Sequence, residues 1–328
     1  MRGTLLAATA VAVMVVVAGC GGDVDTTKVT YTRTTVPAGQ ANTGGATETG
    51  TPRSDDPAFT IDKLRLVEPC ELLTEDLLAS VGKPADNTRG GFSECSNYME
   101  DADGEDLSIT LTLGDSVTNA ADADQNIGGL PAMESKLDSG DACFITVVTS
   151  TSPNFGLVIQ AGGSAKDLCK AGRTVMAGVV EAIRADPPEY DAAKGTLLSV
   201  DPCAALDEAA LTAALGADDE GAPYNLHWCN WSGESANLGL WFRLGFDPEE
   251  GGSDAKPVDL GGGVTGYQEA TTSDVASCEL QFAHRPFDSE DSEIVHLFYD
   301  KSEPAKGEDP CVAPQALAKK LIATLPKP

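Results

Sequence analysis

Eight cysteines fall into two groups of four with matching spacing, and no other feature of the sequence constrains the fold as strongly. Each group begins with an acidic residue and a proline, in the Glu-Pro-Cys that ends at Cys70 and the Asp-Pro-Cys that ends at Cys203. The second cysteine follows after 25 or 26 residues, the third after a further 48 or 49, and the fourth after a further 26 or 33. Because such regularity indicates an internal duplication, the sequence predicts two tandem copies of one small domain, over residues 60–186 and 196–328.

The apolar pattern within each copy predicts the order helix, several strands, helix. A short helix ending at a glycine is expected at residues 75–82 and 208–216, and a longer apolar helix at 168–183 and 314–325. Alternating residues predict strands at 93–99, 107–113, 144–149 and 155–161 in the first copy, and at 227–231, 238–246, 279–284 and 293–299 in the second. This order favours an α+β fold, in which an N-terminal and a C-terminal helix pack on an antiparallel sheet.

An oxidising compartment would allow the eight cysteines to form two disulfides in each copy. Joining the first cysteine to the second and the third to the fourth would attach each helix to the sheet. That choice gives Cys70–Cys95, Cys143–Cys169, Cys203–Cys229 and Cys278–Cys311. Four cysteines allow three connectivities, and the spacing alone does not select one. Because one bridge contributes roughly 3 kcal/mol in the chain-entropy model, these small cores are expected to depend on their disulfides.

The N-terminal segment has the pattern of a bacterial lipoprotein signal. Arg2 provides a basic start, and residues 5–18 form an apolar run that is too short for a membrane-spanning helix, which needs roughly 20 residues. The small residues Ala18 and Gly19 precede the ninth cysteine, Cys20, as in the lipobox of such proteins. We therefore expect residues 1–19 to be removed and Cys20 to carry a thioether-linked diacylglycerol that anchors the chain to the outer face of the cell membrane.

Residues 20–59 are rich in Thr, Gly, Asp and Pro and lack apolar periodicity. Such a segment does not bury enough surface to order itself, so the sequence predicts a disordered tether. A random coil of this length reaches on the order of 35 Å, which would hold the first domain away from the membrane.

The charge of the chain excludes several classes of partner. It has 51 acidic and 22 basic residues, and its formal net charge is -29. That charge repels nucleic acid and bare anionic lipid surfaces, so no nucleic acid partner is expected and the membrane is contacted through the lipid on Cys20. No motif indicates a cofactor.

Candidate metal ligands gather in the second copy. His284 and His296 flank an expected hairpin loop and could face each other across it, with Asp288, Glu290 and Asp291 in the loop. A metal site needs more ligands than these histidines provide, and no cysteine is free, so no metal site is predicted. The acidic run at residues 101–106 lacks the closing glutamate of a calcium loop and is expected to be a hairpin tip.

No catalytic group is predicted. The chain lacks a Gly-x-Ser-x-Gly motif, and paired cysteines leave no thiol nucleophile. All three histidines, at positions 227, 284 and 296, lie in the second copy, which excludes a Ser–His pair within the first.

The Asp/Glu-Pro-Cys-x-x-Leu opening of each copy, ending at Leu73 and Leu206, resembles that of a family of actinobacterial envelope lipoproteins of unknown function. The Cys-x-Trp strand at residues 229–231, the later glycine-rich turn and the cysteine that opens the last helix are similar to that family as well. The first copy departs from the pattern, since no tryptophan follows Cys95. The resemblance implies an extracytoplasmic α+β domain with the first two cysteines paired, and it implies no reaction.

These features favour a non-enzymatic, lipid-anchored envelope protein that binds a small molecule, a wall polymer or a protein. A cell-wall-active hydrolase is the first alternative, and it requires a pocket where serine, an acidic residue and histidine converge in the second copy. A sensor or partner-regulating lipoprotein is the second alternative, and its acidic surface would dock a basic partner in a salt-dependent way.

Overall fold

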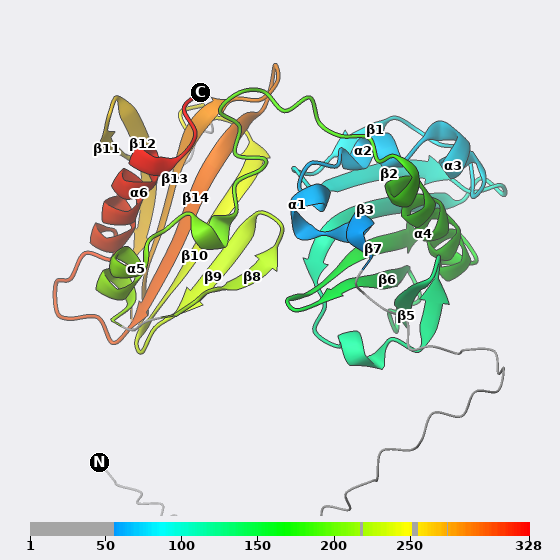
Figure 1. The fold of residues 1–328 in the computed structure, drawn as a ribbon, viewed down its shortest axis with the longest axis horizontal. Coiled ribbons are helices and arrows are strands. Elements are labelled where there is room, and N and C mark those ends of the chain that lie inside the picture. Colours follow the sequence, from blue (N-terminus) through cyan, green and yellow to red (C-terminus); the bar gives the residue numbers. More distant parts are fainter. Residues whose placement is uncertain (1–55, 217–218, 251–254, 274) are drawn as a thin grey trace, which may run out of the picture. The chain divides into compact units, whose positions relative to one another are not determined.

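The computed structural model describes residues 56–216, 219–250, 255–273 and 275–328 (Figure 1). The predicted signal segment 1–19, the lipidation site Cys20 and most of the predicted tether lie outside the described residues. The described chain forms two antiparallel sheets of seven strands each, with helices and two disulfides in each half. The expectation of an α+β fold with two domains is confirmed at this level, and we refer to residues 56–186 and 196–328 as the first and second halves.

The two sheets have the same strand order. The first contains β1 (Asn87–Arg89), β2 (Glu94–Glu100), β3 (Asp106–Ser116), β4 (Gln125–Ile127), β5 (Leu130–Lys136), β6 (Ala142–Thr151) and β7 (Asn154–Gly163). The second contains β8 (Ala222–Asn225), β9 (Trp228–Ser232), β10 (Ala236–Gly245), β11 (Lys256–Gly261), β12 (Val264–Thr271), β13 (Val275–Pro286) and β14 (Ser292–Ser302). From one edge to the other the orders are β1-β2-β3-β7-β6-β5-β4 and β8-β9-β10-β14-β13-β12-β11. Each strand of the first half therefore has a counterpart at the same place in the second.

Eight of these strands coincide with predicted ones, namely β2, β3, β6, β7, β9, β10, β13 and β14. They form the middle of each sheet. The sequence did not predict the other six strands, which lie at the sheet edges or next to them.

Helices cover one face of each sheet. In the first half α4 (Leu168–Ala185) packs on β6 and β7, and in the second α6 (Val312–Thr324) packs on β13 and β14 beside α5 (Glu208–Leu215). Strand residues that face these helices are fully buried, as Leu111 and Ile159 are in the first half and Leu240 and Leu297 in the second. Because side chains alternate along a strand, each sheet has a second face that points away from the helices.

Helix α3 (Glu75–Ala79) ends earlier than the predicted helix at residues 75–82, whereas the helix predicted at residues 208–216 is present as α5, with Gly216 as its left-handed C-cap. In the first half α2 (Pro69–Leu72) ends before α3, because the Thr74 hydroxyl accepts the N–H of Leu77 and starts a new helix. In the second half a 3-10 turn, η3 (Pro202–Ala204), precedes α5, and Asp207 caps α5 in the same way.

The folded part begins earlier than the predicted tether boundary at residue 59. A turn, η1 (Pro57–Phe59), and α1 (Ile61–Leu64) precede the first cysteine. The Phe59 side chain is buried in the core of the first half, which ties this segment to the sheet. A further turn, η2 (Ala120–Asp122), joins β3 to β4.

The disulfides are Cys70–Cys95, Cys143–Cys169, Cys203–Cys229 and Cys278–Cys311, the pairs that attach the helices to the sheets. Each disulfide joins a strand to a helical segment or to the residue just before a helix.

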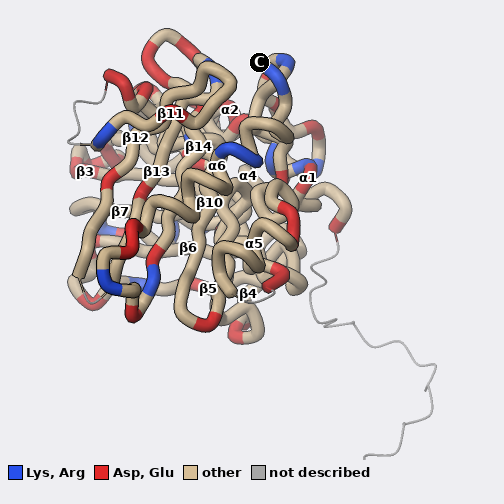
Figure 2. The backbone as a smooth tube through the Cα atoms, turned by 90° about the vertical axis from the view of Figure 1, so that its left-hand side faces the viewer, with Lys and Arg blue, Asp and Glu red and all other residues tan. Residues whose placement is uncertain are grey.

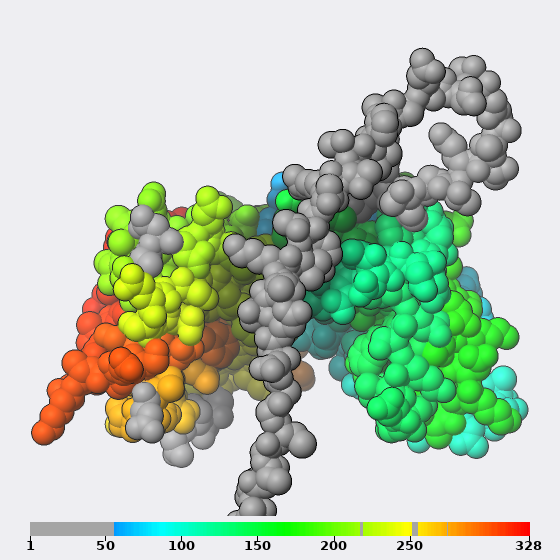
Figure 3. All heavy atoms as spheres, turned by 90° about the horizontal axis from the view of Figure 1, so that it is seen from below, coloured from blue at the N-terminus to red at the C-terminus, as the bar shows by residue number. Residues whose placement is uncertain are grey.

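Figure 2 shows acidic residues spread over the loops and strand ends of both halves, in line with the net charge. In the space-filling view, the first half (cyan and green) and the second half (yellow-green to red) cover separate regions of the surface (Figure 3).

Candidate functional site

The structure keeps the two histidines considered as metal ligands apart from each other. His284 Nε2 lies 2.8 Å from the carbonyl oxygen of Gly195. His296 lies on β14 in register with Gln281 of β13, so it does not face His284. In the loop between these strands, Asp288 accepts the backbone N–H groups of Asp291 and Glu290, and these hydrogen bonds lower the pKa of Asp288.

One group within the described ranges has the spacing of metal ligands: Glu134 with Cys143 and Cys169. These cysteines form a disulfide and offer no thiolate. Glu134 instead forms an ion pair with Arg173 of α4.

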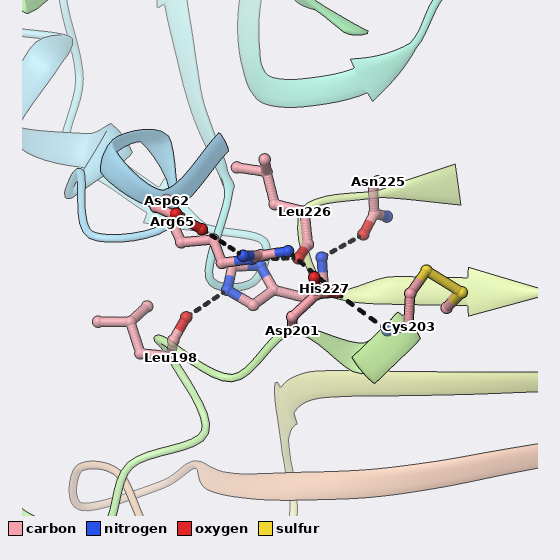
Figure 4. A network of polar contacts seen from close by, with 9 residues as sticks. Asp62, Arg65, Leu198, Asp201, Cys203, Asn225, Leu226 and His227 are labelled. Carbon is pink, nitrogen blue, oxygen red and sulfur yellow. Dashed lines mark hydrogen bonds and ion pairs between the residues drawn. A yellow bond between two sulfur atoms is a disulfide. The ribbon is translucent and has the colours of Figure 1, made fainter. Parts of the chain in front are cut away.

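Polar contacts connect the two halves at a junction, formed by Arg65, Phe92 and Ser93 of the first half and by Asp201, Leu226 and His227 of the second. Arg65, which follows α1, is only 5% exposed. Its Nε donates to Leu226 O at 2.9 Å, and its two Nη atoms lie 3.0 Å and 3.1 Å from Asp62 and Asp201 (Figure 4). Asp201 also accepts the N–H of Cys203, so one carboxylate both caps η3 and binds the guanidinium.

His227 occupies the middle of the junction in its neutral form. Its Nε2 lies 2.9 Å from Leu198 O, and its Nδ1 lies 3.0 Å from the hydroxyl of Ser93. A carbonyl only accepts, so we assign the proton to Nε2, and Nδ1 accepts from the serine hydroxyl. Burial lowers the pKa of His227 to about 4, and the nearby charge of Arg65 acts in the same direction.

The Ser93–His227 contact is a Ser–His pair formed across the two halves. Sequence reasoning missed it because that reasoning considered each copy alone. A general base works best with a pKa near the operating pH, whereas that of His227 is about 4. Its ring is also 3% exposed and uses both nitrogens in hydrogen bonds within the protein. This environment favours a role in joining the halves.

Each half also inserts one apolar side chain into the core of the other. Phe92 is 3% exposed and belongs to the core of the second half, while Leu226 is fully buried in the core of the first. Leu226 packs over Gly114 of β3, where a Cβ atom would lie 2.3 Å from the leucine side chain. The hydroxyl of Tyr190, between the halves, donates to Phe92 O. The junction is therefore packed as a protein interior is.

Four aromatic side chains lie together on the face of the second sheet that points away from the helices. We call Tyr224, Trp228, Trp241 and Phe298 the aromatic row. The ring centroid of Trp228 lies 4.6 Å from that of Tyr224, 5.4 Å from that of Trp241 and 5.8 Å from that of Phe298. The ring planes of Trp228, Trp241 and Phe298 lie within 24° of one another. All four side chains remain partly exposed, Tyr224 the most at 47%.

Backbone and polar groups hold the aromatic row in place. Gly239 of β10 leaves room for it, since a Cβ atom there would lie 3.2 Å from Trp228 Nε1. The Trp228 indole donates to Asn230 at 2.8 Å. The guanidinium of Arg243 lies 5.5 Å from the ring centroid of Trp241, and its Nη2 donates to Gln281 at 2.8 Å.

His296 lies beside the aromatic row and lacks polar partners. Its ring centroid is 3.9 Å from that of Phe298, and its side chain is 9% exposed. Neither ring nitrogen forms a hydrogen bond with any described residue. Burial lowers the pKa of His296 to about 3, so the ring is neutral at pH 7 and the 3.5 Å approach of Glu279 to Nε2 is not an ion pair.

The described residues of the first half contain no counterpart of the aromatic row. The registers align the sheets, because Cys95 pairs with Leu111 as Cys229 pairs with Leu240. By this alignment the places of Trp228, Trp241, His296 and Phe298 are taken in the first half by Glu94, Thr112, Val158 and Gln160. The two halves share a core pattern but differ on this face, so the aromatic row is a property of the second half and not of the fold.

Of the grooves on the described surface, two lie at the junction or in the second half. One, of about 470 Å³, lies beside Arg65 at the junction, and the other, of about 440 Å³, lies between α5 and α6, with six alanines among its lining residues. No histidine lines either groove among the residues that the structure describes.

The four disulfides indicate a protein of an oxidising, non-cytoplasmic environment. Among the described residues, no helix combines the length and apolar character needed to cross a membrane. The chain belongs to the family described as protein of unknown function (DUF3558), whose model matches residues 15–182. No curated protein and no solved structure matches the chain. The expected membership in a family of unknown function is thereby confirmed. That the chain is a lipoprotein, and that its second half is another copy of the same domain, stay predictions.

Proposed function

We propose that this chain is a lipid-anchored extracytoplasmic binding protein, which Cys20 holds at the outer face of the cell membrane and whose ligand contacts the aromatic row. The small residues before Cys20 and the pairing of the other eight cysteines support export and anchoring. We assign the binding surface to the aromatic row. Partly exposed aromatic side chains gathered on one face are typical of binding surfaces.

The first half acts in this proposal as a support. Its junction with the second half is closed by the Arg65 and His227 contacts and by the inserted Phe92 and Leu226 side chains. The binding face would thus be carried at a fixed orientation to the first half.

Native mass spectrometry of the exported protein, before and after exposure to envelope extract, tests the proposal. We expect the wild type to retain a bound mass and a variant with both Trp228→Ala and Trp241→Ala to lose it. Tyr98→Ala is the matched control, because Tyr98 is 65% exposed on the equivalent face of the first sheet. If the wild type retains no mass, the aromatic row is not a binding surface. The same conclusion follows if the double variant has an unchanged melting curve and retains as much of the mass as the wild type does.

The Ser93–His227 contact favours one alternative, a hydrolase acting at the junction. A fluorophosphonate probe labels activated serines. Labelling of the wild type that Ser93→Ala abolishes would support the hydrolase, and an unlabelled wild type would contradict it.

A further inference from the structure

We infer that the ligand of the aromatic row is an uncharged glycan, a chain of sugar rings lying across strands β8, β9, β10 and β14. This inference rests on the proposed function, because it names the class of ligand for the same surface. Shape, charge and hydrogen bonding each contribute to it.

The aromatic row has the extent and composition that suit several linked rings. Its residues come from four adjacent strands, and three strand spacings cover about 14 Å. A sugar ring has an apolar C–H face and polar hydroxyl groups around its rim. It can therefore pack on aromatic side chains while its hydroxyls bind amide groups such as those of Asn230 and Gln281, which lie beside the row.

The charges on this face disfavour ionic ligands of either sign. Glu269 and Glu279 lie directly opposite each other on β12 and β13, and with the net charge of -29 they repel a polyanion. A cation is disfavoured for a different reason, since the guanidinium of Arg243 already lies over Trp241 in the middle of the row. A second cation at that ring would meet a like charge at close range. An uncharged ligand avoids both conflicts.

His296 favours a ligand that has both hydrogen-bond donors and acceptors. A neutral imidazole has one N–H donor and one acceptor nitrogen, and both of these lack partners among the described residues. A hydroxyl can donate and accept, whereas an ammonium only donates and the anion of a phosphodiester only accepts. The Glu279 side chain, 62% exposed and 3.5 Å from Nε2, can turn away to admit such a group. Hydroxyl groups are the defining polar groups of a glycan.

An array of uncharged oligosaccharides, followed by calorimetric titration with the best series, tests this inference on the exported protein. We expect affinity to rise about tenfold from two to four rings and to change little between low and high salt. Trp241→Ala should weaken binding about tenfold or more, Trp241→Phe should restore most of it, and His296→Leu should weaken it several-fold. Tyr98→Ala is again the control and should bind as the wild type does.

The outcomes separate this inference from the function on which it rests. Tight binding of tetramethylammonium or of the polyanion heparin, with no uncharged glycan bound, would overturn the uncharged glycan as the ligand while leaving the aromatic row as a binding surface. A protein that retains a mass from envelope extract through Trp228 and Trp241 but binds no glycan of the array would do the same. Glycan binding that Trp241→Ala does not change would place the glycan elsewhere, and the absence of both glycan and retained mass would overturn the function as well.

Discussion

Acidification should weaken the folded state through His227, by an amount that its surroundings set. The unfolded chain takes up a proton at this histidine near pH 6.5, its ordinary pKa, while the folded chain does so only near pH 4. The folded state is therefore favoured most above about pH 7, and this contribution is lost as the pH falls from 6.5 to 4. A shift of this size corresponds to about 3 kcal/mol in the free energy of unfolding, of which about 2 kcal/mol is lost by pH 5.

Urea unfolding of the wild type and of His227→Gln, followed by circular dichroism from pH 8 to pH 4.5, measures this effect. The glutamine amide can still donate to Leu198 O and accept from Ser93 but does not titrate. The free energy of unfolding of the wild type should therefore fall by about 2.5 kcal/mol relative to that of His227→Gln across that range. His296 and the carboxyl groups titrate in both proteins and cancel in the comparison.

Ser93→Ala provides the matched control. It removes the hydroxyl that donates to Nδ1 but keeps the titrating ring, so it should lower stability at pH 8 and retain most of the wild-type pH dependence. If wild type and His227→Gln lose stability in parallel between pH 8 and pH 4.5, His227 is not held neutral in a buried junction, and the account of the junction fails.

Two further predictions concern the anchor and the junction. Cys20→Ala should abolish labelling of the protein with radioactive palmitate and release it from the membrane fraction; a variant that stays labelled would remove Cys20 as the anchor. Phe92→Ala should lower the free energy of unfolding by about 3–5 kcal/mol in denaturant titrations, because the ring is buried in the core of the opposite half, and Leu137→Ala, at a half-exposed position, serves as the control. An effect no larger than that of the control would contradict the insertion of Phe92.

The sequence predicted the central strands and the last helices because apolar alternation and helical periodicity mark residues that pack on a core. The edge strands lack this signal. Strands β1 and β4 are three residues long, and β5, β11 and β12 contain Pro131, Pro257 and Gly266, residues that usually indicate turns. Helix α2 was missed because a helix of four residues is too short to show apolar periodicity.

The aromatic row was missed because its residues are far apart in the sequence and meet only through the strand order. Trp228 and Trp241 lie on strands that the sequence did predict, at positions pointing away from the helices. That alternation was a usable signal. Phe298, however, joins them because β14 pairs with β10, and no local pattern predicts a pairing between strands so distant in the chain. The junction was missed for a similar reason, since it depends on how two separate domains meet.

The exchange of Phe92 and Leu226 between the cores has a consequence for handling the protein. A protease that cut the chain between residues 187 and 195 would leave two fragments, each filling a hole in the other. If the cut lies before Glu189, the backbone bridge between Glu189 and Val67 would also join the two fragments. The nicked protein should therefore elute from a sizing column as one particle, and it should separate only in denaturant.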